Sequence, residues 1–320
     1  MTDLSFFHAP VMVREVVEAL APRDGGIYVD GTFGRGGYSR AILTCSAALV
    51  FGIDRDPDAI KAGLKLAAEF SPRLKLLNGA FGDMEKLLAA EKVAAVDGVA
   101  LDLGVSSPQL DDAERGFSFR QDGPLDMRMS KSGPSAADIV NARSEHKLAD
   151  IIFLYGEERH ARRIARHIVA ARAKAPITRT LQLAEIVRQA VPRAKDGLDP
   201  ATRTFQALRI AVNDELGELR RGLSAAERLL KPGGRLAVVS FHSLEDRCVK
   251  NFLRLRSSGP VRASRHYPAN DIPSEPSFVL LTRKPVTPSA EEIAANPRAA
   301  SARLRTAERT NAPAFRENAA

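Results

Sequence analysis

The stretch Tyr28-Val29-Asp30-Gly31-Thr32-Phe33-Gly34-Arg35-Gly36-Gly37-Tyr38 decides the fold that this chain is expected to adopt. A short run of β type ends in an acid, a glycine-rich turn follows, and a helix-compatible run begins. Glycine permits positive φ and lets a ligand approach the backbone, because it has no Cβ. A strand, a glycine turn and a helix in this order are typical of the nucleotide-binding corner of a doubly wound α/β sheet.

The sequence around this corner alternates between strand and helix patterns. Apolar residues at helical spacing before Pro22 predict a short helix leading into the first strand. Strands are expected at residues 27–30, 48–53, 74–77 and 98–101, and helices near 38–45, 57–69 and 83–92. Apolar strands separated by helices indicate a parallel sheet with both faces covered.

The alternation stops between Asp111 and about Leu208, where polar turns and then helices follow without a convincing strand. It resumes with a fifth strand at 235–240, a helix, and a late strand at 277–282. We therefore predict a discontinuous α/β core, residues 1–111 and 209–320, interrupted by a mostly helical insertion at 112–208. The last stretch of about thirty residues is expected to be loosely ordered.

The composition limits the classes of protein to which this chain can belong. The 320 residues are 44% hydrophobic and carry a net charge of +8, which favours a polyanionic partner, although an ordinary basic enzyme is equally compatible. Two cysteines, Cys45 and Cys248, are too few for a disulfide framework or a zinc site, so no metal is expected. No signal peptide and no apolar stretch near the ~20 residues of a spanning helix is found, which predicts a cytoplasmic protein without a membrane segment.

The glycine turn itself narrows the choice of cofactor. Gly34, Gly36 and Ser39 come nearest to the dinucleotide pattern G-x-G-x-x-G, but the last position is not glycine, and no P-loop is present. Asp54 ends the second strand, where an acid can accept hydrogen bonds from both ribose hydroxyls. Such a site suits S-adenosylmethionine, which has a ribose and an adenine but no phosphate. The helix start would then hold the carboxylate of the methionyl part.

A third acid, Asp102, ends the fourth strand and could place negative charge near the amino group or sulfonium of that cofactor. One acid at a strand end can equally be a helix cap. However, Asp30, Asp54 and Asp102 each close a core strand, and ligands bind at the carboxyl ends of parallel strands. The three together therefore indicate a ligand site.

Longer motifs stand in order along nearly the whole chain. They lie at residues 8–11, 31–37, 102–111, 115–120, 124–129, 155–158, 204–213 and 240–247. Together they resemble those of the bacterial 16S ribosomal RNA cytosine-N4 methyltransferase family, the RsmH or MraW type. The resemblance implies a class I, Rossmann-like methyltransferase core with an inserted helical domain. It also implies methyl transfer from S-adenosylmethionine to N4 of a cytidine in the P-site or decoding region of 16S rRNA within the 30S subunit.

The resemblance further implies the cofactor contacts. They are Gly36, Gly37, Tyr38, Asp54, Phe81, Asp102 and Gln109. The family turn usually reads Gly-Gly-His, and Tyr38 stands here in the place of the histidine. A contact through the backbone amide would survive this change, whereas a contact through the imidazole would not.

The target amine sets the chemistry that the site must perform. Cytosine N4 is a poor nucleophile, because its lone pair is delocalised into the ring, so it has to be aligned with the methyl group and offered acceptors for its hydrogens. The segment at 106–109 resembles the Ser/Asp/Asn-Pro-Pro-aromatic turn of DNA amino-methyltransferases, with Gln109 instead of the aromatic residue. We expect Ser107 to orient the amine through its hydroxyl or carbonyl and Pro108 to fix the turn; a plain proline loop is the alternative.

A basic run predicts where RNA binds. Six Lys or Arg and no acid stand between Arg159 and Lys174, on a helix with an apolar face. We expect phosphate contacts there, although a solvated basic face has the same pattern. The arginines concerned are Arg162, Arg163 and Arg166, to which Arg298, Arg303 and Arg305 in the tail could add. His242 and Asp246 could face the target base or its phosphate, although a histidine at a strand end is often structural.

Two other functions remain open from the sequence. One is an NAD-dependent oxidoreductase on the same sheet, which the missing third glycine argues against. The other is a non-catalytic RNA-binding assembly factor, which the three strand-end acids argue against. The sequence does not decide between free RNA and the assembled 30S subunit as substrate, nor does it give the oligomeric state.

Overall fold

The computed structural model describes residues 10–191, 197–258 and 275–315. The chain divides into two compact units: Met1–Gly104 with Leu216–Ala320, and Val105–Glu215. Each unit has its own hydrophobic core. The predicted domain boundaries at residues 111 and 208 stay a prediction; the second falls inside helix α10 (Ala201–Asn213).

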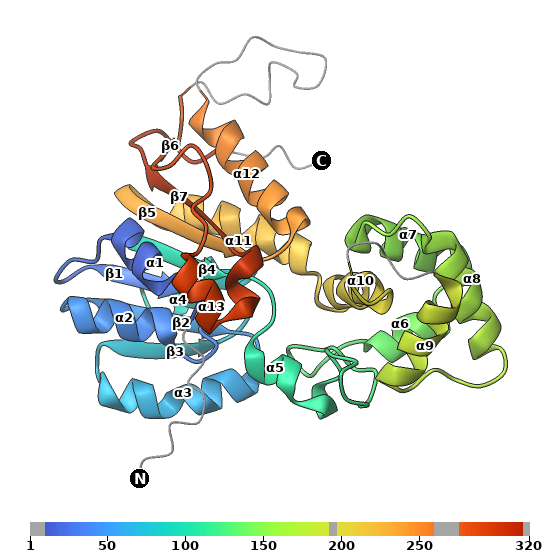
Figure 1. Ribbon diagram of the computed structural model, residues 1–320. Coiled ribbons are helices and arrows are strands. Elements are labelled where there is room, and N and C mark those ends of the chain that lie inside the picture. The colour runs from blue at the N-terminus through green and yellow to red at the C-terminus, as the bar shows by residue number, and fades with distance from the viewer. Residues whose placement is uncertain (1–9, 192–196, 259–274, 316–320) are drawn as a thin grey trace. The chain divides into compact units, whose positions relative to one another are not determined.

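A seven-stranded sheet forms the centre of the first unit, in the order β3-β2-β1-β4-β5-β7-β6 (Figure 1). The strands are β1 (Ile27–Asp30), β2 (Leu49–Asp54), β3 (Leu74–Asn78), β4 (Val96–Asp102), β5 (Leu230–Ser240), β6 (Phe278–Leu280) and β7 (Arg303–Arg309). Strands β1 to β5 pair in parallel, whereas β7 is antiparallel to both of its neighbours. The predicted Rossmann-like α/β sheet is confirmed.

Helices cover both faces of this sheet because successive strand residues point to opposite sides. Val29 and Val99 belong to one core cluster, while their neighbours Tyr28 and Ala100 belong to the other. The first cluster is completed by α4 (Met84–Ala90), α11 (Glu215–Leu229) and α12 (Ser243–Ser257). The second is completed by α1 (Val13–Leu20), α2 (Gly37–Cys45) and α3 (Pro57–Glu69).

The parallel pairing determines where the strand-end acids lie. Asp30, the last residue of β1, pairs in register with Gly52 of β2 and Ala100 of β4. Asp54 and Asp102 follow two residues later on those neighbouring strands. The three carboxyl groups therefore stand at the C-terminal ends of these parallel strands, where β1 leads into α2. We call this end of the sheet the ligand edge.

The C-terminal segment differs from its prediction. We expected about the last thirty residues to be loosely ordered, which is wrong for β7, a central antiparallel strand with Leu304 and Ala307 buried. Before it stand α13 (Ala290–Ala295) and a 3₁₀ turn, η4 (Pro297–Ser301). Apolar and small residues point inward, and the long arginine side chains find acidic partners. Arg305, for example, donates from Nε to Oδ1 of Asp246 at 2.7 Å.

A buried ion pair fastens this end of the chain to the sheet. Glu227 of α11 accepts at Oε2 from Nε of Arg256 at 2.5 Å, and both side chains are at most 2% exposed. Its other oxygen accepts from the hydroxyl of Ser277 and from the backbone N–H of Phe315. Arg309 of β7 donates to the carbonyl of Glu227. One carboxylate thus joins α11, α12 and the segments around β6 and β7.

The second unit is helical in its described part. Its helices are α5 (Ser107–Asp111), η2 (Ala113–Arg115), α6 (Ala136–Ala142), α7 (Glu145–Gly156), α8 (Ala161–Arg172), α9 (Thr180–Ala190) and α10 (Ala201–Asn213). Asn213 fixes the irregular segment before α6, because its amide group donates to the carbonyl of Met127 and accepts from the N–H of Met129. Across the residues described, no helix combines the length and apolar content that a bilayer crossing requires.

Replacing Glu227 by Gln should lower the free energy of unfolding by about 3 kcal/mol, because Arg256 then keeps a buried charge without its counter-charge. Urea unfolding followed by circular dichroism measures this loss. Glu85, whose pair with Arg228 is more than 40% exposed on both sides, provides the control. Glu85→Gln should cost less than about 1 kcal/mol. Equal losses in the two variants would contradict the role given to Glu227.

Candidate functional site

The glycine turn between β1 and α2 lets neighbouring segments approach the backbone closely at the start of the helix. Gly36, the N-cap of α2, has φ +74°. A Cβ on Gly36 would lie 2.4 Å from Leu66, and a Cβ on Gly37 would lie 2.0 Å from the ring of Pro10. The first backbone N–H groups of a helix have no intrahelical acceptor, so they can bind an anion such as a carboxylate.

Asp30 is the buried acid beside this turn. Its residue is 1% exposed, and Oδ2 accepts from the N–H of Ser39 at 3.1 Å and from its hydroxyl at 2.7 Å. Its other oxygen, Oδ1, is buried without a hydrogen-bond partner among the described residues. Burial raises the pKa of Asp30 to about 6, against the lowering effect of the hydrogen bonds from Ser39 and of the nearby backbone N–H of Thr32. A buried acceptor without a donor is costly unless a ligand completes it.

Asp54 stands at the end of β2 with both oxygens partly engaged. Oδ2 accepts from the N–H of Gly34 at 2.8 Å, and Oδ1 accepts from the N–H of Asp56 at 2.8 Å. Burial raises the pKa of Asp54, although these two hydrogen bonds lower it. A carboxylate has about four acceptor sites, so Asp54 fixes the glycine turn and keeps capacity for two hydroxyl groups.

Asp102 at the end of β4 is the acid with the fewest partners. Its N–H donates to the hydroxyl of Thr32 at 2.6 Å, which holds the strand end against the glycine turn. Its Oδ1 is buried, and within the described chain no donor reaches it. Burial raises the pKa of Asp102 well above its usual range, and the charges of Asp30 and Glu245 raise it further.

Phe81 supplies an apolar surface near the same edge. It begins the 3₁₀ turn η1 (Phe81–Asp83), which follows β3. Its ring packs on α11 where a Cβ added to Gly222 would lie 2.4 Å away, and its own Cβ lies 3.2 Å from a Cβ placed on Gly31. An aromatic ring at this position can pack against the adenine of a nucleoside.

The side chain of Tyr38 is anchored to the segment before α1. Its side chain is buried, and its hydroxyl donates to the carbonyl of Val11 at 2.6 Å. Burial raises the pKa of this phenol well above its usual range, so it remains a neutral donor. The tyrosine side chain therefore joins α2 to the segment before α1, and only its backbone amide stays at the helix start.

The remaining cofactor and catalytic candidates belong to the second unit. Ser107 and Pro108 occupy the first turn of α5, which is a short helix and not an irregular loop. Gln109 is buried, and its Oε1 accepts from the N–H of Ser106 at 3.0 Å. Gln109 thus stabilises the start of α5, and a contact between Gln109 and the cofactor stays a prediction.

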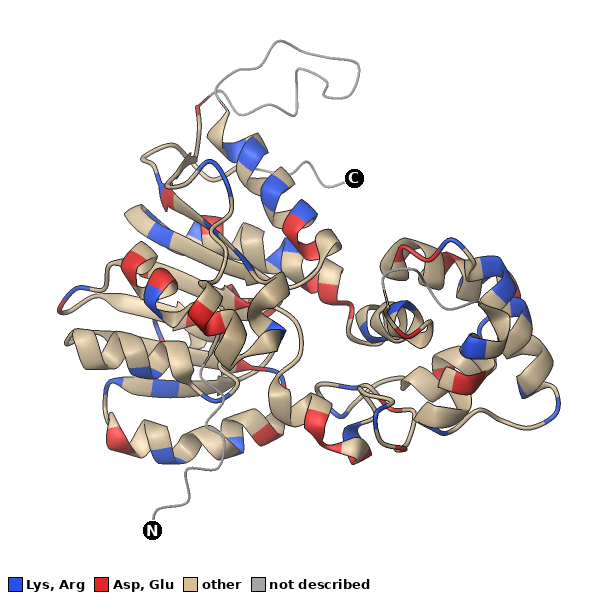
Figure 2. Ribbon diagram, viewed as in Figure 1, with Lys and Arg blue, Asp and Glu red and all other residues tan. Residues whose placement is uncertain are grey.

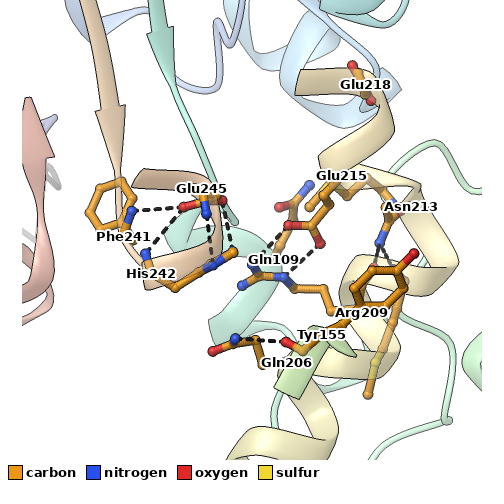
Figure 3. Close-up of polar contacts among 12 residues, drawn as sticks. Gln109, Tyr155, Gln206, Arg209, Asn213, Glu215, Glu218, Phe241, His242 and Glu245 are labelled. Atoms are coloured by element: carbon orange, nitrogen blue, oxygen red, sulfur yellow. Dashed lines mark hydrogen bonds and ion pairs between the residues drawn. The ribbon is translucent and has the colours of Figure 1, made fainter. Parts of the chain in front are cut away.

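His242 has a structural role in the first unit (Figure 3). It caps α12, and its Nε2 lies 3.1 Å from Oε1 of Glu245, with the imidazole 11% exposed. Glu245 also accepts from the N–H groups of Phe241 and His242. Contact between His242 and RNA stays a prediction, whereas Asp246 next to this turn is engaged by Arg305. The sequence analysis missed Glu245, although a polar cap followed three residues later by Glu is a known helix-start signal.

The basic run forms the exposed face of α8 (Figure 2). Ile164 and Ile168 are buried on its inner side. Arg162 and Arg163 are exposed and have no acidic partner among the described residues, while Arg166 lies 4.0 Å from Glu145. This geometry suits phosphate contacts. Arg305, by contrast, is largely buried against Asp246, so the tail contributes less exposed charge than we expected.

Within the described part of the first unit, one edge of the sheet thus gathers a helix start, a carboxylate, an aromatic ring and two buried carboxyl oxygens to which no described residue donates. These features fit S-adenosylmethionine, which carries a carboxylate, a ribose, an adenine and a net positive charge. The sequence identified all of these residues. It did not show that Asp30 and Asp102 leave oxygens unpaired, which depends on the packing.

Comparison with known proteins gives a consistent result. The model of the MraW methylase family matches residues 5–310. A protein of Rhodospirillum centenum named ribosomal RNA small subunit methyltransferase H is 65% identical over 314 residues, covering 98% of this chain and 95% of that protein. A protein of Paramagnetospirillum magneticum with the same name is 60% identical, covering 96% of this chain and 97% of that one.

A solved rRNA methylase from Streptococcus thermophilus is 10% identical with a TM-score of 0.38, and the match covers 93% of this chain and 94% of that one. At this level the structural likeness adds no argument of its own. The sequence relatives and the strand order together identify the sheet as that of a class I, Rossmann-like methyltransferase.

Replacing Tyr38 by Phe should cost about 1 kcal/mol of folding stability, because the carbonyl of Val11 loses its donor. The dissociation constant for S-adenosylmethionine should stay within about twofold, since the backbone amide is unchanged. Gly37→Ala should weaken binding far more, because its Cβ meets the ring of Pro10. Calorimetric titration measures both. A tenfold or greater loss of affinity in Tyr38→Phe would show that the side chain contacts the ligand.

Proposed function

The chain belongs to the MraW methylase family, and on that premise we propose that it methylates N4 of a cytidine in the decoding region of 16S rRNA, using S-adenosylmethionine. The observation that carries this proposal is the pair of buried carboxyl oxygens of Asp30 and Asp102, to which no described residue donates a hydrogen bond, beside the start of α2. A site with this charge arrangement suits a nucleoside that carries positive charge and no phosphate. The names of the relatives support rRNA of the small subunit as the substrate, and the motif resemblance supports the N4 amine.

Each residue at the ligand edge binds a different part of the cofactor. Backbone amides at Gly37 and Tyr38 receive the carboxylate of the methionyl part. Gly36 stands beside them in the turn, with its own N–H donated to the carbonyl of Phe33. Asp54 accepts from the ribose hydroxyls while its bonds to Gly34 and Asp56 hold it in place. Phe81 packs against the adenine. When bound, the cofactor supplies an electrophilic methyl group on a positively charged sulfur.

Ser107 and Pro108 are the residues that we assign to the target amine. Pro108 stands in the first turn of α5, where its fixed φ suits a helix start. Ser107 is half-buried, and no described residue bonds to its hydroxyl, which leaves it available to accept from the N4 amine. Holding that amine in line with the methyl group reduces the entropic cost of the reaction. The target base has to leave its stack to reach such a residue.

RNA affinity comes from the exposed face of α8. Arg162, Arg163 and Arg166 supply charge without sequence preference, which fits a substrate recognised through its backbone and shape. The net charge of +8 adds a longer-range attraction. A cytoplasmic location follows from this substrate and is part of the proposal.

Incubating the protein with labelled S-adenosylmethionine and unmethylated 30S subunits tests the reaction directly. The expected product is N4-methylcytidine after nucleoside digestion, with no label in subunits that are already methylated. Incorporation at another base or another atom would contradict the assignment. Absence of incorporation, with cofactor binding intact, would favour an assembly factor, and stabilisation by NAD alone in a thermal-shift titration would favour an oxidoreductase.

Ser107→Ala should lower kcat for methyl transfer by about 100-fold, at the lower end of the roughly 100- to 1,000-fold range seen when one polar contact to a reacting group is removed. Its affinity for S-adenosylmethionine should not change, because the hydroxyl acts on the amine. Ser132→Ala, an exposed serine of the same unit, serves as the matched control and should keep the wild-type rate. A wild-type rate in Ser107→Ala would exclude a side-chain role.

The double variant Arg162→Ala/Arg163→Ala should weaken binding to 30S subunits and reduce the slope of log K against log salt by about 2, one counterion for each lost contact. Filter binding over a salt series measures the slope. Arg14 is also an exposed arginine, 77% accessible on α1 of the other unit, and Arg14→Ala should leave the slope unchanged. An unaltered slope in the double variant would place the RNA contacts elsewhere.

A further inference from the structure

The strand ends of β1 and β4 hold two carboxyl groups that face each other across the glycine turn. Asp30 is 1% exposed, and its charge acts on Asp102. Each has an Oδ1 that is buried without a partner in the described part of the chain. Asp30 is almost fully buried, and Asp102 is half-buried with its Oδ1 out of contact with water, so a negative charge on one carboxyl group disfavours a negative charge on the other.

The titratable groups near Asp102 come from β1, α12 and α2. Asp30 faces it from β1 and Glu245 from α12, and both raise its pKa. The phenol of Tyr38 on α2 faces the same group and is a neutral donor to Val11. No cationic side chain of the described residues lowers the pKa of Asp102. The nearby acids therefore compete for protons, and one of them has to be neutral.

Hydrogen bonds decide which acid that is. Asp30 accepts twice from Ser39. Asp54 accepts from two backbone amides, and Glu245 accepts from the amides of Phe241 and His242. Such donors favour the charged form of a carboxyl group. Among the described residues no such donor reaches the carboxyl group of Asp102, so we assign the proton to this member of the cluster.

We infer that Asp102 is the residue by which this site distinguishes the cationic cofactor from its neutral product: it holds a proton in the free protein and releases it to solvent when the sulfonium enters. The inference rests on the proposed cofactor. S-adenosylmethionine carries a net charge of +1, whereas S-adenosylhomocysteine has a neutral thioether and a net charge of zero. Methyl transfer removes the positive charge that stabilises ionised Asp102, so the carboxyl group takes up a proton again and the product is held less tightly.

The direction in which cofactor affinity changes with pH follows from the coupling between cofactor binding and proton release. The pKa of Asp102 is raised in the free protein and falls when a positive charge binds beside it. Affinity for S-adenosylmethionine should therefore increase with pH above the ordinary range of an aspartate, until free Asp102 itself ionises. Affinity for S-adenosylhomocysteine should change less over the same range, because no sulfonium stabilises the charged carboxylate.

Calorimetric titration of the full chain, in phosphate and in Tris at one neutral pH, counts the protons released by each ligand. S-adenosylmethionine should release about one proton more than S-adenosylhomocysteine. Equal proton counts with both ligands bound would overturn the inference and leave the proposed function standing. Failure of both ligands to bind would overturn the cofactor assignment together with the inference. The two failures are thus distinguishable.

Asp102→Asn adds a second test, because the amide has the shape of the protonated acid but cannot release a proton. The difference in proton release between the ligands should disappear. Affinity for S-adenosylmethionine should fall at least about tenfold, while affinity for S-adenosylhomocysteine stays within about twofold. Asp24→Asn, an exposed aspartate of the same unit, should keep the wild-type difference. If Asp102→Asn does not fold, the wild-type proton count decides alone, and retained discrimination in a folded Asp102→Asn would overturn the inference.

Discussion

The parallel pairing of β1 with both β2 and β4 is the constraint on which the site depends. It brings the ends of three strands, and hence Asp30, Asp54 and Asp102, to one edge of the sheet. Carboxylates this close are unfavourable in a folded protein unless donors or positive charge satisfy them. Asp54 is satisfied by backbone amides, whereas oxygens of the other two are not satisfied by the described residues. The proposed preference of this site for a cation thus follows from the topology of the sheet.

The rest of the first unit holds this edge in place. Thr32 fixes the end of β4 to the glycine turn, and Tyr38 fixes α2 to the segment before α1. Glu227 joins α11 and α12 to the C-terminal strands through a buried pair with Arg256. None of these contacts uses the buried Oδ1 atoms of Asp30 and Asp102. The exposed arginines of α8 belong to the other unit, where positive charge serves a different partner.

Much of the fold was predictable because the core strands are apolar and bounded by turns, as at residues 27–30 and 98–101. The strand β7 was missed because its arginines suggested a solvated tail; only tertiary contacts, such as that of Arg305 with Asp246, make those side chains fit a sheet. Strand-end acids were visible in the sequence, but their unpaired oxygens were not. The orientation of Tyr38 depended on the distant carbonyl of Val11, which no local pattern indicates.

A crystal structure of the protein with S-adenosylmethionine tests the central claim most directly, namely that the carboxyl edge of the sheet holds this cofactor. We predict the methionyl carboxylate at the amides of Gly37 and Tyr38, the ribose on Asp54, and the positively charged part next to the carboxyl oxygens of Asp30 and Asp102. Binding at any other place, or a bound cofactor that leaves those two oxygens without a partner, would contradict it.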